Sequence, residues 1–431
     1  MTELISSNPE QLIELAQKQG ATHAEVYRVR SQSRPVSFEG NRLKQLESSQ
    51  SEGTALRLWK DNRPGLAVGY GLIDAETLVN KAIALSALNQ PETIELGASR
   101  QEIHNSLGTI IPVEDFVTMG KTAIATLRNA YPEVICSAEF ESETETTRLV
   151  NSNGLDCQYT DISVSYYLGV EIVRGEDFLG IYDGEYSREK INPQQIVKQI
   201  LQRLDWAKTN VAPITGKVPI LFTADAATLL WSTVSSALNG KRVKTGSSPW
   251  SEKKGAIVLS QMISLSQQPD KEPYSCPFDD EGTPTQSINL IDRGRLTQFY
   301  SDRTTARELG LETTGNGFRP SLGSYPTPSL VNLIVEPGEG SFNELVTKLD
   351  RGIIVDQILG GGADISGDFS INVDLGYLVE NGHIIGRVKD TMIAGNVYDV
   401  LQQVIALGKD RLWNGSCYTP ALIVEGLSVV G

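Results

Sequence analysis

Histidine and cysteine are scarce in this sequence. Its 431 residues include three histidines, at positions 23, 104 and 383, and four cysteines, at positions 136, 157, 276 and 417. The cysteines are far apart and form no Cys-x-x-Cys pair, so neither a zinc knuckle nor a disulfide framework is indicated, and we expect a reduced protein of the cytoplasm. The histidines are equally dispersed, and a three-histidine metal site would require them to converge by chance.

Long hydrophobic runs and runs of positive charge are also missing. No stretch approaches the roughly 18 apolar residues that a membrane-spanning helix needs, and residues 1–7 lack the basic and apolar regions of a secretion signal. We therefore expect no membrane association. Lysine and arginine number 38 against 53 acidic residues, which gives a net charge of −15. Because this charge repels the phosphate backbone, the composition argues against a nucleic-acid partner.

The residues that are present indicate a globular protein of more than one domain, since 40% are hydrophobic and 21% are charged. In the first half, apolar periodicity predicts helices that alternate with dense runs of short strands. These helices are expected near residues 9–19, 74–88, 113–130 and 193–207. The result is an α+β unit in which helices cover an antiparallel sheet.

Proline and glycine between Val211 and Gly216 interrupt both periodicities and predict a domain boundary. We predict a first domain over residues 1–212, with sub-regions of about 1–90 and 112–210, and a second domain over residues 217–431. The second half is dominated by strands, and its Asn381-Gly382 pair is a strong hairpin signal. A curved antiparallel sheet or partial barrel is therefore expected there.

The stretch from Thr223 to Gly240 predicts a core helix at the start of the second domain. Thr223 can cap its first turn, and Gly240 suits the left-handed residue after its last turn. Apolar residues recur at helical spacing and form one stripe that should be buried. They are Ala227, Leu230, Val234, Ala237 and Leu238.

Two polar segments of the second half each allow two interpretations. The carboxylates of residues 279–281 are either a metal cluster or a solvated turn that caps a strand, and the absence of a nearby histidine favours the turn. The glycine-containing run from Gly360 to Gly367 either cradles an anion or marks a backbone that is closely approached. Because a strand rather than a helix follows this run, we favour the second interpretation.

Six segments appear together in an order that resembles the TldD/PmbA family, whose alternative label, modulator of DNA gyrase, describes a downstream effect rather than DNA binding. They are Asp279–Pro284, Leu290–Leu296, Thr314–Arg319, Ser366–Ser370, Glu380–Gly382 and Ile393–Val397. In the peptidase subunit of this family, a helix carries a His-Glu-x-x-x-His metal motif. The corresponding positions here are Trp231, Ser232 and Ser236, which supply neither imidazole nor carboxylate ligands.

The resemblance therefore implies the branch of the family without the metal motif, a subunit that is catalytically silent in isolation. It implies a cytoplasmic metallopeptidase in which a TldD-like partner supplies a zinc-type ion and an unfolded peptide is the substrate. This chain is expected to bind no cofactor itself and to form a heterodimer, or a homodimer with a second copy. The alternative is a stand-alone peptide-binding or scaffold homologue that has no proteolytic role.

The resemblance also implies a groove in which an extended peptide lies as an added strand. The residues that we expect to line it are Asn316, Gly317, Gly360, Gly361, Gly362, Ser366, Gly367, Asp368 and Cys417. Cys417 falls where the peptidase subunit is expected to provide a cysteine ligand. Since no base adjacent to Cys417 can be named, we interpret it as an ordinary thiol.

Overall fold

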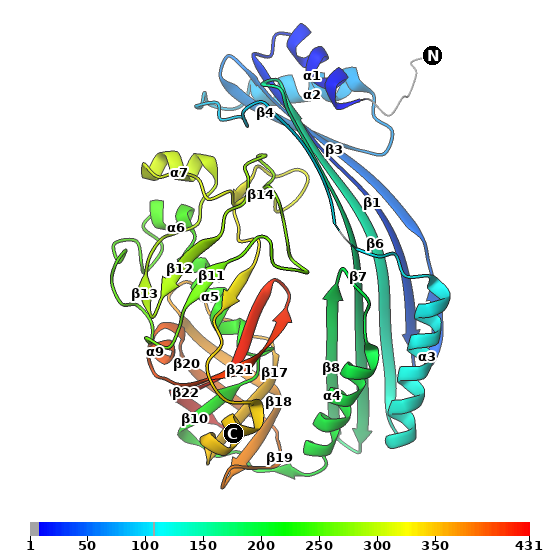
Figure 1. The fold of residues 1–431 in the computed structure, drawn as a ribbon, viewed down its shortest axis with the longest axis vertical. Coiled ribbons are helices and arrows are strands. Elements are labelled where there is room, and N and C mark those ends of the chain that lie inside the picture. Colours follow the sequence, from blue (N-terminus) through cyan, green and yellow to red (C-terminus); the bar gives the residue numbers. More distant parts are fainter. Residues whose placement is uncertain (1–7, 107) are drawn as a thin grey trace.

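The computed structural model describes residues 8–106 and 108–431 and has a mixed α+β fold. Its first large sheet has the strand order β4-β3-β1-β6-β7-β5, with β2 beside β1 and β8 beside β7. Figure 1 shows these long strands curving past the second domain. Their bounds are β1 His23–Glu39, β2 Arg42–Leu46, β3 Ser49–Lys60, β4 Arg63–Tyr70, β5 Arg100–Asn105, β6 Ile135–Asn151, β7 Leu155–Arg174 and β8 Asp177–Ser187.

The strands of this sheet are longer than their apolar runs predict. The sequence suggests separate strands at 24–30 and 35–39, but β1 is continuous because its polar middle pairs on both sides. There Gln32 lies opposite Gln50 of β3 and Thr144 of β6, so the backbone groups find partners whatever the side chains are. The residues 90–111, expected as a connector, include β5, which pairs in parallel with β7.

Helices cover one face of this sheet. The side chains of each strand alternate between the two faces, and the apolar ones on this face pack against the helices. Helix α3 (Val113–Ala130) has the predicted bounds, and its Phe116 stacks on Phe140 of β6 with ring centroids 5.6 Å apart. Helix α4 (Pro193–Trp206) covers the same face nearer to β8. At one end of the sheet lie α1 (Pro9–Lys18) and α2 (Ala75–Ser86), and Asp74 caps α2 by accepting a hydrogen bond from the Thr77 N–H.

Five strands of the second domain close into a ring in which each pairs with the next. In order they are β22 (Cys417–Val430), β10 (Gly216–Phe222), β17 (Gly352–Leu359), β18 (Asp368–Glu380) and β20 (Thr391–Asn396), which pairs again with β22. The expectation of a strand-rich curved sheet or partial barrel is thus confirmed, and the ring is complete. Closure removes free sheet edges and encloses a large apolar core.

Shorter elements extend this ring. The strands are β9 Asn210–Val211, β11 Leu265–Gln267, β12 Ile288–Asp292, β13 Arg295–Leu296, β14 Gly317–Phe318, β15 Thr327–Pro328, β16 Leu333–Val335, β19 His383–Val388 and β21 Val404–Asn414. The helices are α5 Thr228–Ala237, α6 Gly240–Lys244, α7 Arg303–Leu309, α8 Phe342–Leu349 and α9 Val397–Gln402. The predicted hairpin between β18 and β19 is confirmed, with Asn381 and Gly382 both at positive φ.

The helix predicted from Thr223 to Gly240 differs at both ends. Helix α5 begins at Thr228, because residues 224–227 form a turn in which the Ala226 N–H bonds the Thr223 hydroxyl. Gly240 was expected in a left-handed conformation, which is wrong. It opens α6 instead, and a side chain there would collide with the carbonyl oxygen of Tyr300, 2.8 Å from an added Cβ. The predicted apolar stripe is confirmed as fully buried.

Buried ion pairs join the two sheets. Glu25 of β1 forms an ion pair with Arg57 of β3 at 3.0 Å and accepts a hydrogen bond from Arg319, which follows β14, at 2.9 Å. At the other end of the interface, Arg203 of α4 bridges Asp183 of β8 and Asp356 of β17, at 2.6 and 2.9 Å. The geometry between the sheets is therefore fixed at two separate points.

Candidate functional site

Helix α5 carries Trp231, Ser232 and Ser236, the three positions that the resemblance assigns to the metal motif. Trp231 is 1% exposed, and its indole Nε1 donates a hydrogen bond to Oγ1 of Thr419 in β22 at 2.7 Å. Ser232 is exposed, and its hydroxyl donates to the carbonyl oxygen of Leu229 in the preceding turn. Ser236 is half-buried. The tryptophan thus joins the helix to the barrel wall through the core.

These residues do not fit a zinc-type ion. An indole N–H donates only and cannot ligate, while the Ser232 hydroxyl is already turned toward its own helix. In the described ranges, no group of three or more His, Cys, Asp and Glu side chains is placed to hold a metal ion. His23, His104 and His383 begin β1, lie in β5 and begin β19, respectively. Trp231, Ser232 and Ser236 of this helix therefore supply no imidazole or carboxylate donor.

Cys417 lies close to this helix in the fold. It begins β22, two residues before the partner of Trp231, and a two-residue step places Cys417 and Thr419 on the same face of the strand. Burial raises the pKa of the Cys417 thiol to about 12, so the thiol is neutral near pH 7. A neutral thiol is a poor nucleophile and a poor metal ligand, which agrees with its interpretation as an ordinary thiol.

An array of aromatic rings runs from the β21–β22 hairpin to the first sheet. Trp413 stacks on Tyr418 with ring centroids 4.7 Å apart, and it contacts Tyr274 at 4.9 Å. Tyr274 in turn stacks on Tyr186 of β8 at 5.0 Å. Arg411 lies over the Tyr418 ring, 4.5 Å from its centroid. The array forms a wall of flat, partly apolar surface between the two sheets.

A cavity of about 370 Å³ lies beside this array, at the junction of the two domains. Tyr27 of β1, Glu145 of β6 and Asp161 of β7 contribute to its lining from the first sheet, opposite Tyr274 and Arg319 of the second domain. The residues on the sheet side occupy the face that the helices leave open. Residues of both domains therefore form the walls of this cavity.

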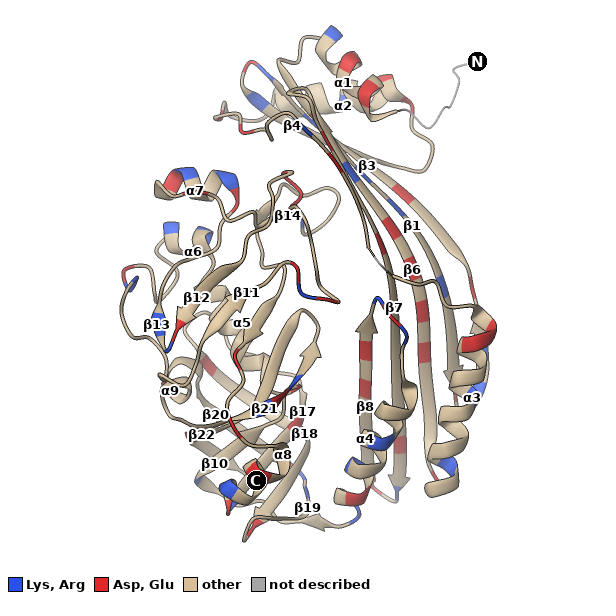
Figure 2. Ribbon diagram, in the orientation of Figure 1, with Lys and Arg blue, Asp and Glu red and all other residues tan. Residues whose placement is uncertain are grey.

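The same open face of β6 carries a row of carboxylates. Its alternating residues Glu139, Glu141, Glu143 and Glu145 lie opposite Tyr167, Ser165, Ser163 and Asp161 of β7. The acidic bands along β6 are visible in Figure 2. Partial desolvation raises the pKa values of Glu143 and Glu145, and the neighbouring carboxylates raise them further. The space between the domains is therefore acidic on the side of the sheet.

Asn316 and Gly317 are placed inside the protein. The Asn316 side chain is fully buried, and its Nδ2 donates to Oε1 of Gln267 and to the carbonyl oxygen of Ser329 at 2.7 and 2.8 Å. The Gly317 N–H donates to Oδ2 of Asp279 at 2.8 Å. The hydrogen-bonding groups of both residues are therefore used inside the protein, where they hold neighbouring loops together.

The carboxylates of residues 279–281 form a turn, but the expectation that it is solvated is wrong. Asp279 is 1% exposed, and its Oδ1 accepts hydrogen bonds from the N–H groups of Glu281 and Thr283. The backbone donors take the place of water, so the turn can be buried. Burial raises the pKa values of Asp279 and Glu281 well above the ordinary range of carboxylic acids.

The remaining groove candidates lie in the β17–β18 loop. Because β10 and β17 run in parallel, this loop is at the same end of the barrel as the start of α5 and the hairpin that carries Cys417. Gly361 has φ +81°, and a Cβ there would lie 2.6 Å from the carbonyl oxygen of Ser370, while Gly360 and Gly362 face open space. Gly367 packs against Tyr398, and Ser366 and Asp368 are exposed at the loop end.

The sequence interpretation missed the aromatic array and the acidic row. The row had a readable signal in its alternation, because a glutamate at every second position places all four on one face if the segment is a single strand, as β6 is. The array had none, since Tyr186, Tyr274 and Trp413 come from segments that only the tertiary fold brings together.

Comparisons with known proteins agree with this architecture. Residues 215–431 match the family model of the PmbA/TldA metallopeptidase C-terminal domain, and residues 24–86 match that of domain 1. A metalloprotease PmbA homologue of Haemophilus influenzae is 25% identical over 97% of this chain and 94% of its own length.

Solved structures of similar chains share the whole fold. TldE from Thermococcus kodakarensis superimposes with a TM-score of 0.88 at 26% identity, covering 98% of this chain and 99% of that one. A putative modulator of DNA gyrase from Thermotoga maritima gives a TM-score of 0.86 at 26% identity, with the same coverage. The chain therefore belongs to the PmbA/TldD metallopeptidase family.

Proposed function

We propose that this chain is the non-metal subunit of a cytoplasmic peptidase that acts on unfolded peptides. A TldD-like partner supplies the zinc-type ion that activates water, and this chain completes the groove and positions the substrate. The partner is a TldD-like chain in a heterodimer, with a homodimer of this chain as the alternative. The described residues include no helix long and apolar enough to cross a membrane.

One observation carries this proposal. At the three positions of α5 where a metal-binding relative needs imidazole and carboxylate, this chain has an indole committed to Thr419 and two serines. The indole ties the helix into the barrel, so the surrounding frame is kept for a structural reason after the chemistry has been lost. A subunit that retains the shape of the site but not its donors fits a supporting role in a peptidase.

The inner surface supports the proposed role in binding peptides. Among the described strands, β8 pairs with β7 alone, and its other edge faces the barrel, where Gln357 of β17 donates to the carbonyl oxygen of Tyr182. An extended peptide recognised by main-chain hydrogen bonds needs such an edge. The Tyr186–Tyr274–Trp413 array offers flat surface to side chains of varied shape.

The test uses the purified chain alone and after mixing with the TldD-like chain of the same organism. Light scattering after size-exclusion chromatography, elemental analysis and cleavage of an unfolded peptide are measured on both samples. We expect zinc well below one ion per chain and no cleavage for the chain alone, and a stable complex with about one zinc and measurable cleavage for the mixture.

Two outcomes would contradict the proposal. Absence of a complex at micromolar concentration would favour a stand-alone peptide-binding homologue. Cleavage by the chain alone that is lost in Cys417→Ala would assign the chemistry to this chain. The matched control is Cys136→Ala. Cys136 is a buried thiol of β6 in the first sheet, whereas α5 belongs to the second domain.

A further inference from the structure

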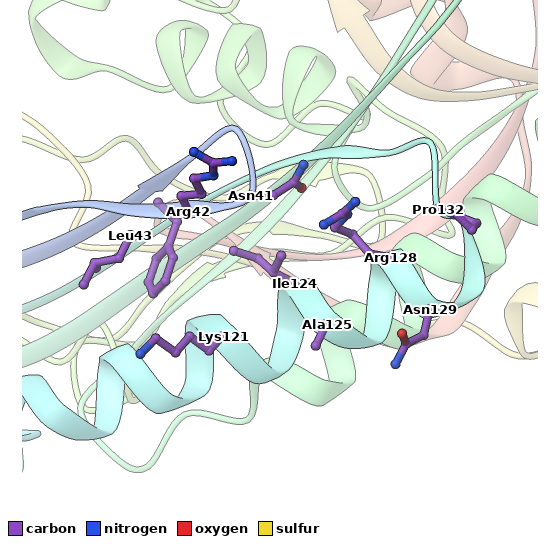
Figure 3. A pocket seen from close by; sticks show the side chains of 10 residues that line it. Asn41, Arg42, Leu43, Lys121, Ile124, Ala125, Arg128, Asn129 and Pro132 are labelled. Atoms are coloured by element: carbon purple, nitrogen blue, oxygen red, sulfur yellow. The ribbon is translucent and has the colours of Figure 1, made fainter.

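A second, larger cavity lies on the opposite face of the first sheet. It measures about 780 Å³ and sits between α3 and the β1–β2 hairpin, as Figure 3 shows. Its side chains are apolar or positively charged or carry an amide, and none is acidic. They are Phe38, Asn41, Arg42, Leu43, Lys121, Ile124, Ala125, Arg128, Asn129 and Pro132. The lining contains no carboxylate, although the chain carries a net charge of −15.

Lys121 and Arg128 are available to a ligand in the cavity. Within the described ranges, Arg42, Lys121 and Arg128 form neither an ion pair nor a side-chain hydrogen bond. Glu39 lies opposite Arg42 on the far face of the hairpin and forms an ion pair with Lys44, and Glu133 forms an ion pair with Arg174. The positive charges of Lys121 and Arg128 are therefore not neutralised inside the protein.

The cations are arranged around an apolar floor. Lys121 and Arg128 are seven residues apart on α3, which is two turns of helix and about 10 Å along its axis. Ile124 and Ala125 lie between them on the same face of the helix, because they are three and four residues after Lys121. On the opposite wall, Phe38 and Leu43 face the helix, while Arg42 lies opposite Glu39 and its side chain points away from α3 in Figure 3.

The wall formed by the hairpin is rigid. Asn41 has φ +70°, and its side-chain Oδ1 accepts a hydrogen bond from the Cys136 N–H at 2.8 Å, while its own N–H donates to the Cys136 carbonyl oxygen at 3.0 Å. Gly120 of α3 packs directly against the Phe38 ring. The hairpin and the helix are thus held in fixed relation, which lowers the entropic cost of binding.

The strand beside the cavity has an open edge. Among the described strands, β2 pairs with β1 alone, and all its residues are exposed, including Leu43 and Leu46. Unpaired main-chain groups on an edge strand are a template for an added strand. The open edge and the cations therefore favour an extended polypeptide over a compact anion.

We propose that this cavity binds an extended acidic peptide segment along β2, with two acidic residues four positions apart and an apolar residue midway. All three side chains of such a segment lie on one face of the added strand, and the acidic ones are about 13 Å apart. The long side chains of Lys121 and Arg128 span the remaining distance, and the apolar residue covers Ile124 and Ala125. This site is distinct from the proposed groove, because it lies on the face that α3 covers.

The test is isothermal titration calorimetry of the full chain with the peptide acetyl-Ser-Glu-Thr-Leu-Thr-Glu-Ser-amide at up to about 1 mM. We expect binding that weakens between 50 and 200 mM NaCl, as approximate working concentrations, and that is lost when both glutamates are replaced by glutamine. Each of Lys121→Gln and Arg128→Gln should weaken binding about two- to five-fold, and the double variant about four- to 25-fold.

The matched control is Lys198→Gln, which removes one exposed positive charge from the neighbouring helix α4 and should leave the affinity unchanged. No heat of binding, an equal affinity for the glutamine peptide, or an equal loss in Lys198→Gln would overturn the proposal. Competition by inorganic phosphate at the same concentration as the peptide would instead assign the cavity to small anions and also refute a peptide site. None of these results bears on the peptidase role, which has separate readouts.

Discussion

The hydrogen bond between Trp231 and Thr419 gives the sharpest test of how α5 is held to the barrel. In Thr419→Val the shape of residue 419 is nearly unchanged, but the indole N–H loses its acceptor in a site without water access. An orphaned buried donor costs about 1–3 kcal/mol. In Trp231→Phe the donor is removed as well, while the Thr419 hydroxyl keeps its bond to the carbonyl oxygen of Pro420 at 3.0 Å.

The double variant separates the hydrogen bond from packing. If each single variant breaks the same bond, combining them should cost less than the sum of the two, by about 1 kcal/mol. Because a protein with two large sheets need not unfold in one step, the local stability is best read from amide hydrogen exchange of α5 and β22. A loss of 1–2 kcal/mol corresponds to exchange about 5- to 30-fold faster.

The control and the refuting result are equally specific. Thr122→Val makes the same substitution on the exposed side of α3 and should leave exchange in α5 and β22 unchanged. If Thr419→Val exchanged no faster than this control, or if the two single costs simply added, then Trp231 would not tie the helix to the barrel. The structural account of the retained frame would then be wrong.

Three further predictions follow from buried and titrating groups. Arg203→Met should destabilise the protein by about 3–5 kcal/mol in urea denaturation, because it leaves the buried Asp356 carboxylate without its cation; an unchanged midpoint would refute this. The Cys417 thiol should react with a thiol reagent at pH 8 only after unfolding, since its pKa is raised to about 12; rapid native labelling would contradict it. Glu143→Gln should stabilise the protein by about a few tenths of a kcal/mol at pH 7 and by nothing near pH 3. The folded pKa of Glu143 is raised, so ionisation opposes folding above the ordinary pKa, and the reverse pH dependence would refute the argument.

The two faces of the first sheet carry opposite charge. The face toward the second domain has the acidic row of β6, and the face covered by α3 has the basic cavity. Glu143 and Phe38 belong to strands of the same sheet, yet one side chain faces the second domain and the other packs beneath α3. Alternation along each strand produces this division. A ligand on one face therefore meets a charge environment opposite to that on the other.

The sequence by itself determined the local elements of this protein. Helix α3 has the predicted bounds, and the β18–β19 hairpin turns at Asn381-Gly382, because apolar spacing and positive-φ turns act within a few residues. The six ordered segments also identified the family, since each is a local pattern of turns and strand ends.

The tertiary structure decided what depends on partners distant in the chain. The continuous length of β1, the pairing of β5 and the burial of Asp279 each require backbone donors or acceptors from elsewhere. Closure of the barrel depends on β20 meeting β22, and the cation cavity depends on a hairpin and a helix about 80 residues apart in sequence. Such contacts form only when the whole chain has folded, so no local pattern of residues encodes them.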